Sequence, residues 1–289
     1  MLNKMRMLLV LAAALVSVPA LSASASGSAW NNSALNGSAL NGSALNSPVL
    51  LKLNQFYVVY TSPVAPYVDQ ENRLMVPLRS LSNLLSADVS YNSDSKTAVI
   101  TRKNYGEEAK VKFYTIKMKI GSKKAEINGA SSEMDTAPAL YKGSMFVPLS
   151  VITSSFHIGT KWDASKRMAA LNVDPAYLPS GVVMDELHFL SDKLNPDIRP
   201  LKASAVTRTN ASGIRVANVQ LTVANEGTST ILKDQLYLHV YVQDSSFTYL
   251  DIPMQPGAAK AGGTFTADTA PHTILADSLQ YVLVGAYNN

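Results

Sequence analysis

The 289-residue sequence contains no cysteine, which excludes disulfides, thiolate metal sites, iron–sulfur clusters and a cysteine nucleophile. Charged residues are also scarce, at 16% of the chain against roughly 25% in typical soluble domains. The net charge of +4 is small, and no segment has the concentrated basic face of a nucleic-acid-binding protein. Without disulfides the fold depends on its packed core, which favours a bacterial envelope protein over a eukaryotic secreted one.

Long apolar runs are absent except near the start of the chain, where the residues have the pattern of a secretory signal peptide. Two basic residues precede an apolar run over 7–16, which is shorter than the roughly 20 residues needed to span a membrane. Small residues then mark a cleavage site after Ala25. We therefore predict a signal peptide over 1–25 and a secreted or cell-wall-associated, extracellular protein without a membrane span.

Residues 26–48 contain a five-residue unit, Ser-Ala-Leu-Asn-Gly, written three times with one change in the last copy. Each unit offers a single leucine, which provides too little apolar surface to offset the entropy lost on ordering. We predict a flexible tether over 26–48, and a surface-recognition repeat is the alternative interpretation.

Two stretches that lie 71 residues apart read almost alike: "LMVPLRSLSNLLSADVSYN" from Leu74 and "MFVPLSVITSSFHIGTKWD" from Met145. Each predicts a strand, a short helix opened by proline and a return strand. One copy is too small to bury a sufficient core. We therefore predict two repeats, at about 50–102 and 116–173, that pack together within a domain over 49–174. The apolar helix faces expected to be buried are Leu78, Leu81, Leu84 and Leu85 in the first copy, and Leu149, Ile152 and Phe156 in the second.

The repeated residues resemble the copper amine oxidase N-terminal-like domain, also called a stalk domain, of Gram-positive spore-forming bacteria. The first copy keeps Val76-Pro77-Leu78-Arg79, and the second keeps Val147-Pro148-Leu149 and Trp162-Asp163. Ser86 stands where the family pattern has glycine, and Ser150 stands where it has arginine. The resemblance covers about 50–173 and implies a scaffolding or adhesive role at the cell wall.

Catalysis by the oxidase itself would require three copper-binding histidines and a tyrosine in an Asn-Tyr-Asp/Glu motif. Asn104-Tyr105 is followed by Gly106, so the acidic position is missing. The carboxylate pairs Glu107-Glu108 and Asp185-Glu186 are interpreted as solvated. We predict a protein that is not an enzyme, without catalytic residues, a metal or a cofactor. Its four histidines are His157, His188, His239 and His272, and no two of them form a His-x-His pair.

The remaining sequence changes character. Residues 175–202 are predicted to be a linker with a short helix over 184–196, and residues 203–289 resemble an Ig-like β-sandwich. The fold class is therefore predicted as α+β, a two-repeat antiparallel sheet and short-helix domain followed by an all-β sandwich. Its strands are expected at 215–224, 235–243, 264–267 and 279–286. The side chains expected to face inward are Val219, Leu221, Val223, Leu236, Leu238, Val240 and Val242.

Several residues are candidates for ligand binding. Arg79 either bridges to the neighbouring repeat or contacts a ligand. Tyr91 and Trp162 occupy matched positions, which favours core packing, with stacking on sugars as the alternative. A tyrosine strip on the sandwich would involve Tyr237, Tyr241 and Tyr249.

The expected partners are cell-wall or extracellular polysaccharide, or another envelope protein, and not nucleic acid. The lysines at Lys117, Lys119, Lys123 and Lys124 are interpreted as a solvated face. A glycan-binding module is the alternative function. A protease inhibitor or regulator that uses the loop over 244–249 is a further alternative.

Overall fold

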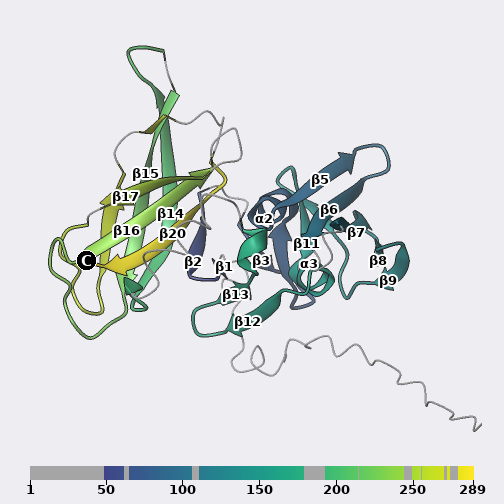
Figure 1. Cartoon of the computed structure of the whole chain (residues 1–289), viewed down its shortest axis with the longest axis horizontal. Coiled ribbons are helices and arrows are strands. Elements are labelled where there is room, and N and C mark those ends of the chain that lie inside the picture. Colours follow the sequence, from purple (N-terminus) through teal and green to yellow (C-terminus); the bar gives the residue numbers. More distant parts are fainter. Residues whose placement is uncertain are drawn as a thin grey trace, which may run out of the picture. The chain divides into compact units, whose positions relative to one another are not determined.

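The computed structural model describes residues 49–61, 65–105, 111–178, 193–213, 215–243, 249–254, 256–269, 272–273 and 279–289. The predicted signal peptide and tether lie outside these residues, as does most of the linking helix predicted over 184–196. The described part is mostly β-structure with two short α-helices (Figure 1). Within the described ranges, no helix has the length and apolarity needed to cross a membrane.

The N-terminal part runs through two series of elements in the same order. The first is β1 (Leu50–Leu53), β2 (Phe56–Tyr60), β3 (Tyr67–Val68), β4 (Leu74–Pro77), α2 (Leu78–Leu84), β5 (Ala87–Asn92) and β6 (Thr97–Tyr105). After β7 (Val111–Lys119), the second is β8 (Lys124–Ile127), β9 (Ala130–Glu133), β10 (Ala139–Tyr141), β11 (Ser144–Pro148), α3 (Leu149–Ser155), β12 (Gly159–Asp163) and β13 (Met168–Asn172).

The C-terminal part begins after a 3₁₀ turn, η2 (Pro175–Tyr177). Its strands are β14 (Ile198–Thr209), β15 (Arg215–Asn225), β16 (Leu236–Gln243), β17 (Tyr249–Met254), β18 (Thr264–Asp268), β19 (His272–Thr273) and β20 (Tyr281–Asn288). The four strands expected from the sequence correspond to β15, β16, β18 and β20. Three strands were not predicted: β14, which begins inside the predicted linker, β17 and the two-residue β19.

Both helices begin directly after a Val-Pro pair. Pro77 has φ −65° and ψ 117°, and Pro148 has φ −61° and ψ 128°, so each proline is extended and ends its strand. The helix therefore starts one residue later than the sequence predicted, with proline at the N-cap. The predicted apolar faces are confirmed, because every one of these side chains is buried: Leu78, Leu81, Leu84, Leu85, Leu149, Ile152 and Phe156.

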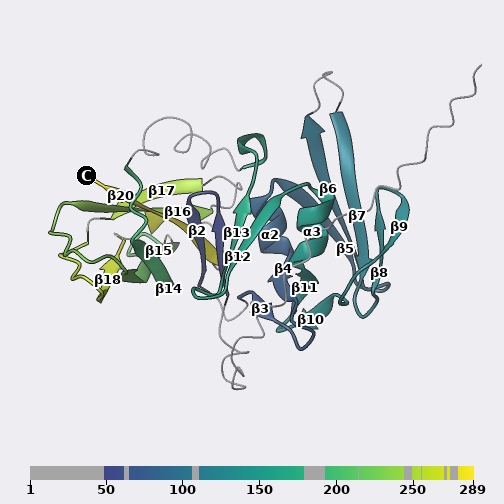
Figure 2. The ribbon, with the colours of Figure 1, turned by 90° about the horizontal axis from the view of Figure 1, so that it is seen from below.

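The two series of elements are interleaved in the sheets. The five-stranded sheet, in the order β5-β6-β7-β8-β9, joins the return strands of the first series to the opening hairpin of the second. The seven-stranded sheet, β12-β13-β1-β2-β20-β16-β17, joins the return strands of the second series to the opening hairpin of the first. Between them lies a four-stranded sheet, β10-β11-β4-β3, and Figure 2 shows α2 and α3 beside it.

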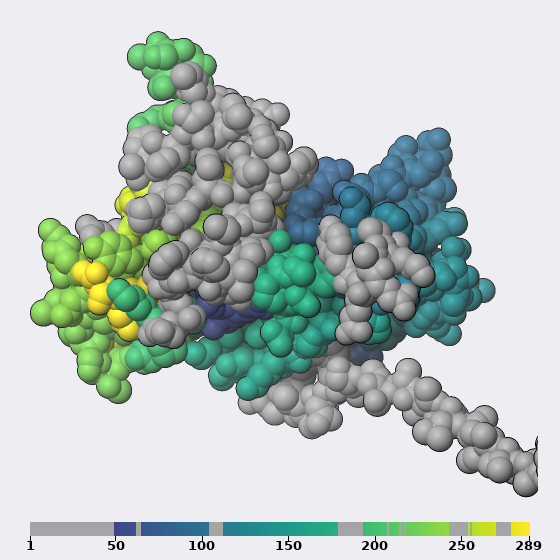
Figure 3. Space-filling model, in the orientation of Figure 1, coloured from purple at the N-terminus to yellow at the C-terminus, as the bar shows by residue number. Residues whose placement is uncertain are grey.

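The hairpin of β1 and β2 contributes to the core of the C-terminal part. Strand β2 pairs antiparallel with β20, with Val59 opposite Val282, so the seven-stranded sheet continues into the C-terminal part. Tyr57 and Val59 are buried in the same cluster as Leu221 and Val240, the core between this sheet and β14-β15-β18. Figure 3 shows the purple surface of the hairpin between the C-terminal strands and the teal second series.

The core of the C-terminal part has two sheets as its walls. All seven side chains predicted to face inward are buried there. The core also includes Met168 from β13 and Ile198 from the unpredicted β14. Residues from both sides of the linker predicted at 175–202 therefore build this core jointly.

Candidate functional site

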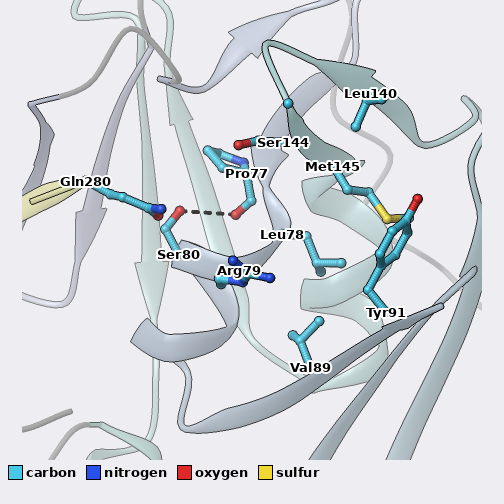
Figure 4. A pocket seen from close by; sticks show the side chains of 11 residues that line it. Pro77, Leu78, Arg79, Ser80, Val89, Tyr91, Leu140, Ser144, Met145 and Gln280 are labelled. Carbon is cyan, nitrogen blue, oxygen red and sulfur yellow. Dashed lines mark hydrogen bonds between the residues drawn. The ribbon is translucent and has the colours of Figure 1, made fainter. Parts of the chain in front are cut away.

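A surface cavity of about 120 Å³ lies where α2 begins (Figure 4). Several elements and turns contribute to it, including the second residue of α2, Arg79, and the outer end of β5, Tyr91. Leu140 of β10, Met145 of β11 and Gln280 just before β20 complete the side walls. The cavity thus brings together Arg79 and Tyr91, two of the residues singled out from the sequence.

Among the described residues, the lining of the cavity has one charged side chain, that of Arg79, and no carboxylate. Ser80 also lines it, but its hydroxyl lies 3.1 Å from the Pro77 carbonyl and 3.0 Å from the Tyr60 hydroxyl. The Ser80 hydroxyl is therefore occupied inside the fold (Figure 4). The polar side chains left to meet a ligand are those of Arg79, Tyr91, Ser144 and Gln280.

Two of the apolar or aromatic side chains that line the cavity are exposed to solvent. Tyr91 is 45% exposed and Leu140 is 62% exposed. The expectation that Tyr91 packs in the core is therefore wrong, because β5 is an edge strand whose outer end extends beyond the buried face. Trp162, at the matched position of β12, is half-buried and does not line this cavity.

The predicted tyrosine strip on the C-terminal part does not form as an exposed surface. Tyr241 is fully buried and packs edge-on against Phe56, with ring centroids 5.2 Å apart. Tyr237 is half-buried on β16. Tyr249 begins β17, but its side chain lies outside the described residues, as does the loop at 244–248.

The histidines lie in separate elements. His157 follows α3 with φ 56° and its ring meets Tyr114 edge-on, whereas His239 on β16 stacks against Tyr241. His188 and the side chain of His272 lie outside the described residues. In the ranges that the structure describes, no group of three potential metal ligands occurs.

The lysine face predicted to be solvated lies on the five-stranded sheet. Lys117, Lys119, Lys123 and Lys124 are not buried, and Lys117 Nζ lies 3.9 Å from a Glu126 carboxylate oxygen. Lys123 Nζ lies 3.0 Å from Glu71. The lysine charges are therefore partly compensated by acidic neighbours.

One unusual residue was not singled out from the sequence. Arg102, near the end of β6, is 3% exposed, and its guanidinium lies between the rings of Phe156 at 4.1 Å and Tyr177 at 4.2 Å. It donates a hydrogen bond of 2.9 Å to the Phe156 carbonyl. Burial lowers the pKa of the Arg102 guanidinium from its ordinary value. The alternation of β6 signals an inward position, but nothing local identifies the two rings that enclose it.

A second polar cluster joins the two parts of the chain. Lys166, in the β12–β13 turn, lies 2.8 Å from Glu226, and Arg199 of β14 lies 2.5 Å from the same carboxylate. Burial by itself would raise the pKa of Glu226, but hydrogen bonds from Lys166 and Arg199 and their positive charges lower it below its ordinary value. The cluster ties the second series of elements to the C-terminal strands.

Comparison with known proteins adds one informative match. No curated protein matches the chain. Among solved structures, a mutant of the Bacillus subtilis oxalate decarboxylase is 11% identical, with 80% of this chain and 77% of that chain covered and a TM-score of 0.10. Another oxalate decarboxylase structure is also 11% identical, with 85% and 76% covered and the same TM-score of 0.10. Similarities at this level carry no argument about fold or activity.

The informative match covers the two series of elements. The family model for the copper amine oxidase N-terminal domain matches residues 52–171, from β1 to β13. This range contains both Val-Pro-Leu helices and the strands they connect. Residues 52–171, less than half of the chain, are therefore similar to the copper amine oxidase N-terminal domain.

Proposed function

We propose that the protein is exported and acts as a non-catalytic scaffold or adhesin of the cell envelope, secreted or associated with the cell wall. The domain family whose model matches residues 52–171 is a non-catalytic stalk domain, which is compatible with such a role. The observation that carries the proposal is the seven-stranded sheet, in which β2 of this domain pairs with β20 of the C-terminal part. A sheet shared in this way makes a stiff unit suited to holding a binding surface away from an anchor.

The stalk domain in this proposal is an α+β unit of two repeats, at about 50–102 and 116–173. The central register supports the duplication, because Val76 pairs with Val147 while Phe146 pairs with Pro77 and Pro148 with Met75. Adding 71 to the numbers of Met75 and Pro77 gives Phe146 and Pro148. The two pairs are therefore equivalent when the copies are exchanged, as expected for a two-fold relation. The C-terminal part in this proposal is an Ig-like sandwich.

A second function is favoured by a specific observation. Arg79 and Tyr91, from different elements, line one surface cavity with exposed apolar walls. A cation together with an exposed aromatic ring suits the recognition of a sugar, which has polar groups and an apolar ring face. Glycan binding therefore supplies the adhesive contact in this proposal.

Retention on purified wall material tests the proposed function. The mature protein would be incubated with purified peptidoglycan and with extracellular polysaccharides, and bound protein would be measured after washing at physiological salt. We expect retention on at least one of these materials, with the heat-unfolded protein and bare beads as controls. Retention on none of them would contradict an adhesive role.

A further inference from the structure

Arg79 differs from the other arginines whose contacts the structure describes. Arg73 forms an ion pair with Asp135 at 2.6 Å, and Arg199 forms one with Glu226. Arg102 is buried between two rings. Arg79 is exposed at the cavity and has neither an ion pair nor a hydrogen bond to any described residue. The predicted bridge from Arg79 to a neighbouring carboxylate is therefore absent from the described residues.

The charge of the cavity selects the ligand class. The described residues of its lining include a guanidinium and no carboxylate, so an anion is attracted there and meets no like charge from them. A guanidinium presents parallel N–H donors that match the two oxygens of a carboxylate. The neutral donors and acceptors nearby, Ser144 and Gln280, suit hydroxyl groups.

The size and the walls of the cavity limit the shape of the ligand. Its volume of about 120 Å³ is close to the roughly 150 Å³ of an enclosed cavity that binds benzene, so it accepts at most one ring. The exposed Tyr91 ring and the Leu140 side chain offer apolar surface for the C–H face of such a ring. Figure 4 shows Arg79 and Tyr91 reaching the pocket from α2 and β5.

We propose that this cavity binds one acidic sugar residue of an envelope polysaccharide, with the carboxylate on Arg79 and a ring face on Tyr91. The inference rests on the proposed envelope function and names the ligand class of its adhesive contact. The matched position in the second series has Ser150 in place of Arg79 and Val151 in place of Ser80. It therefore has no cation to bind a carboxylate, and we expect one acidic-sugar site per chain.

A pair of matched oligosaccharides tests this assignment. Calorimetry would compare binding of trigalacturonic acid and of its methyl ester, which keeps the rings and removes the charge, to the mature protein. We expect the acid to bind with a stoichiometry of one and the ester to bind at least about tenfold more weakly, because the ester cannot form the charge-assisted pair. Equal affinity for both, or no binding of the acid, would overturn the proposal.

Four variants locate the site. Arg79→Gln is expected to weaken binding of the acid about tenfold, and Tyr91→Ala about threefold to tenfold. The matched controls are Arg208→Gln, an exposed arginine on β14, and Phe113→Ala, an exposed aromatic on β7, which should bind as the wild type does. An equal loss in Arg208→Gln would show general attraction to positive charge and overturn the assignment.

One further substitution and the wall assay distinguish failure of the acidic-sugar site from failure of the proposed adhesive role. Arg79→Lys keeps the charge but lacks the planar fork, so we expect binding between that of the wild type and that of Arg79→Gln. Matching thermal unfolding curves would establish that the variants are folded. If Arg79→Gln is retained on wall material as well as the wild type, the acidic-sugar site is wrong while the adhesive role stands. If the wild type itself is not retained, the proposed function fails first.

Discussion

Val76 and Val147 lie directly opposite each other in the antiparallel pair of β4 and β11, and both are fully buried. They are the same residue of the two Val-Pro-Leu stretches, 71 positions apart. Each valine therefore meets its own counterpart at the centre of the four-stranded sheet. Contact between these matched residues is compatible with the two-repeat arrangement proposed above.

The contact between these valines predicts energetic coupling. Val76→Ala and Val147→Ala should each lower the free energy of unfolding by about 2 kcal/mol, because each removes two buried methyl groups. The double variant should depart from additivity by about 0.5 kcal/mol or more, as directly facing residues do. Urea denaturation measures all three values. Val76→Ala combined with Val240→Ala, a residue of the C-terminal core, is the additive control, and additivity in both pairs would contradict the coupling.

A substitution at Ser86, the second residue after α2, should increase the stability of the fold. Ser86 has φ 49°, in the left-handed region, where glycine is favoured and other residues are strained. Ser86→Gly should raise the free energy of unfolding by about 0.5 kcal/mol, the relief of strain exceeding the added freedom of the unfolded chain. Ser90→Gly on the neighbouring strand β5 is the control and should lower stability. A loss in both variants would argue against strain at Ser86.

The Arg102 side chain should not be replaceable by lysine. Its flat guanidinium contacts the Phe156 and Tyr177 rings on both faces, whereas an ammonium is a compact charge that is costly to bury. Arg102→Lys should therefore lower the free energy of unfolding by about 2 kcal/mol, measured in urea. Lys103→Arg, at the exposed neighbouring position, should change it little. An unchanged midpoint for Arg102→Lys would refute the stacking argument.

The Glu226 cluster predicts a dependence of stability on acid. The folded-state pKa of Glu226 lies below its ordinary value of 4.5, so its stabilisation is present above pH 4.5 and is lost as the pH falls through the folded-state pKa. The unfolding temperature of Glu226→Gln should therefore be lower than that of the wild type at pH 7. The difference between the two temperatures should shrink below pH 4.5. Thermal unfolding across this range measures the effect. Glu133→Gln, at an exposed position, should show a smaller difference at pH 7, and an equal one would contradict the prediction.

The shared core predicts that the C-terminal part depends on the hairpin. A fragment of residues 193–289 lacks Tyr57, Val59 and Met168 from its core, and its strand β20 loses the partner β2. It should therefore show no cooperative thermal transition and poor dispersion of amide resonances. Residues 49–289 are the control and should unfold in one transition. A cooperatively folded fragment would show that the hairpin is dispensable.

The local elements could be predicted from the sequence where the pattern is strong. The helix faces were predicted correctly because leucines and prolines at fixed spacing have few alternatives. Strand β14 was missed because Pro200 interrupts it, and the structure accommodates that proline at a register shift between Pro200 and Lys202. Strand β17 also contains a proline, Pro253, which an edge strand tolerates. Proline in a strand weakens the sequence signal without preventing the strand.

The candidate site could be predicted only in part. Arg79 and Tyr91 were noticed as residue types at particular positions, but their meeting in one cavity with Leu140 and Gln280 was not predictable. These residues span 200 positions of the chain, and no local pattern relates them. Arg102 was overlooked because its two rings, Phe156 and Tyr177, come from later segments.

By itself, the sequence determined the two Val-Pro-Leu helices, their buried faces and most of the C-terminal strands, because these depend on spacing and backbone preference over a few residues. Only the tertiary structure decided which hairpin pairs with which strands, and that β2 contributes to the core of the C-terminal part. Strand pairing is made by backbone hydrogen bonds, which are alike for every residue and leave little trace in the side chains. Which strand pairs with the edge of a sheet is therefore decided by how the whole chain packs around its cores.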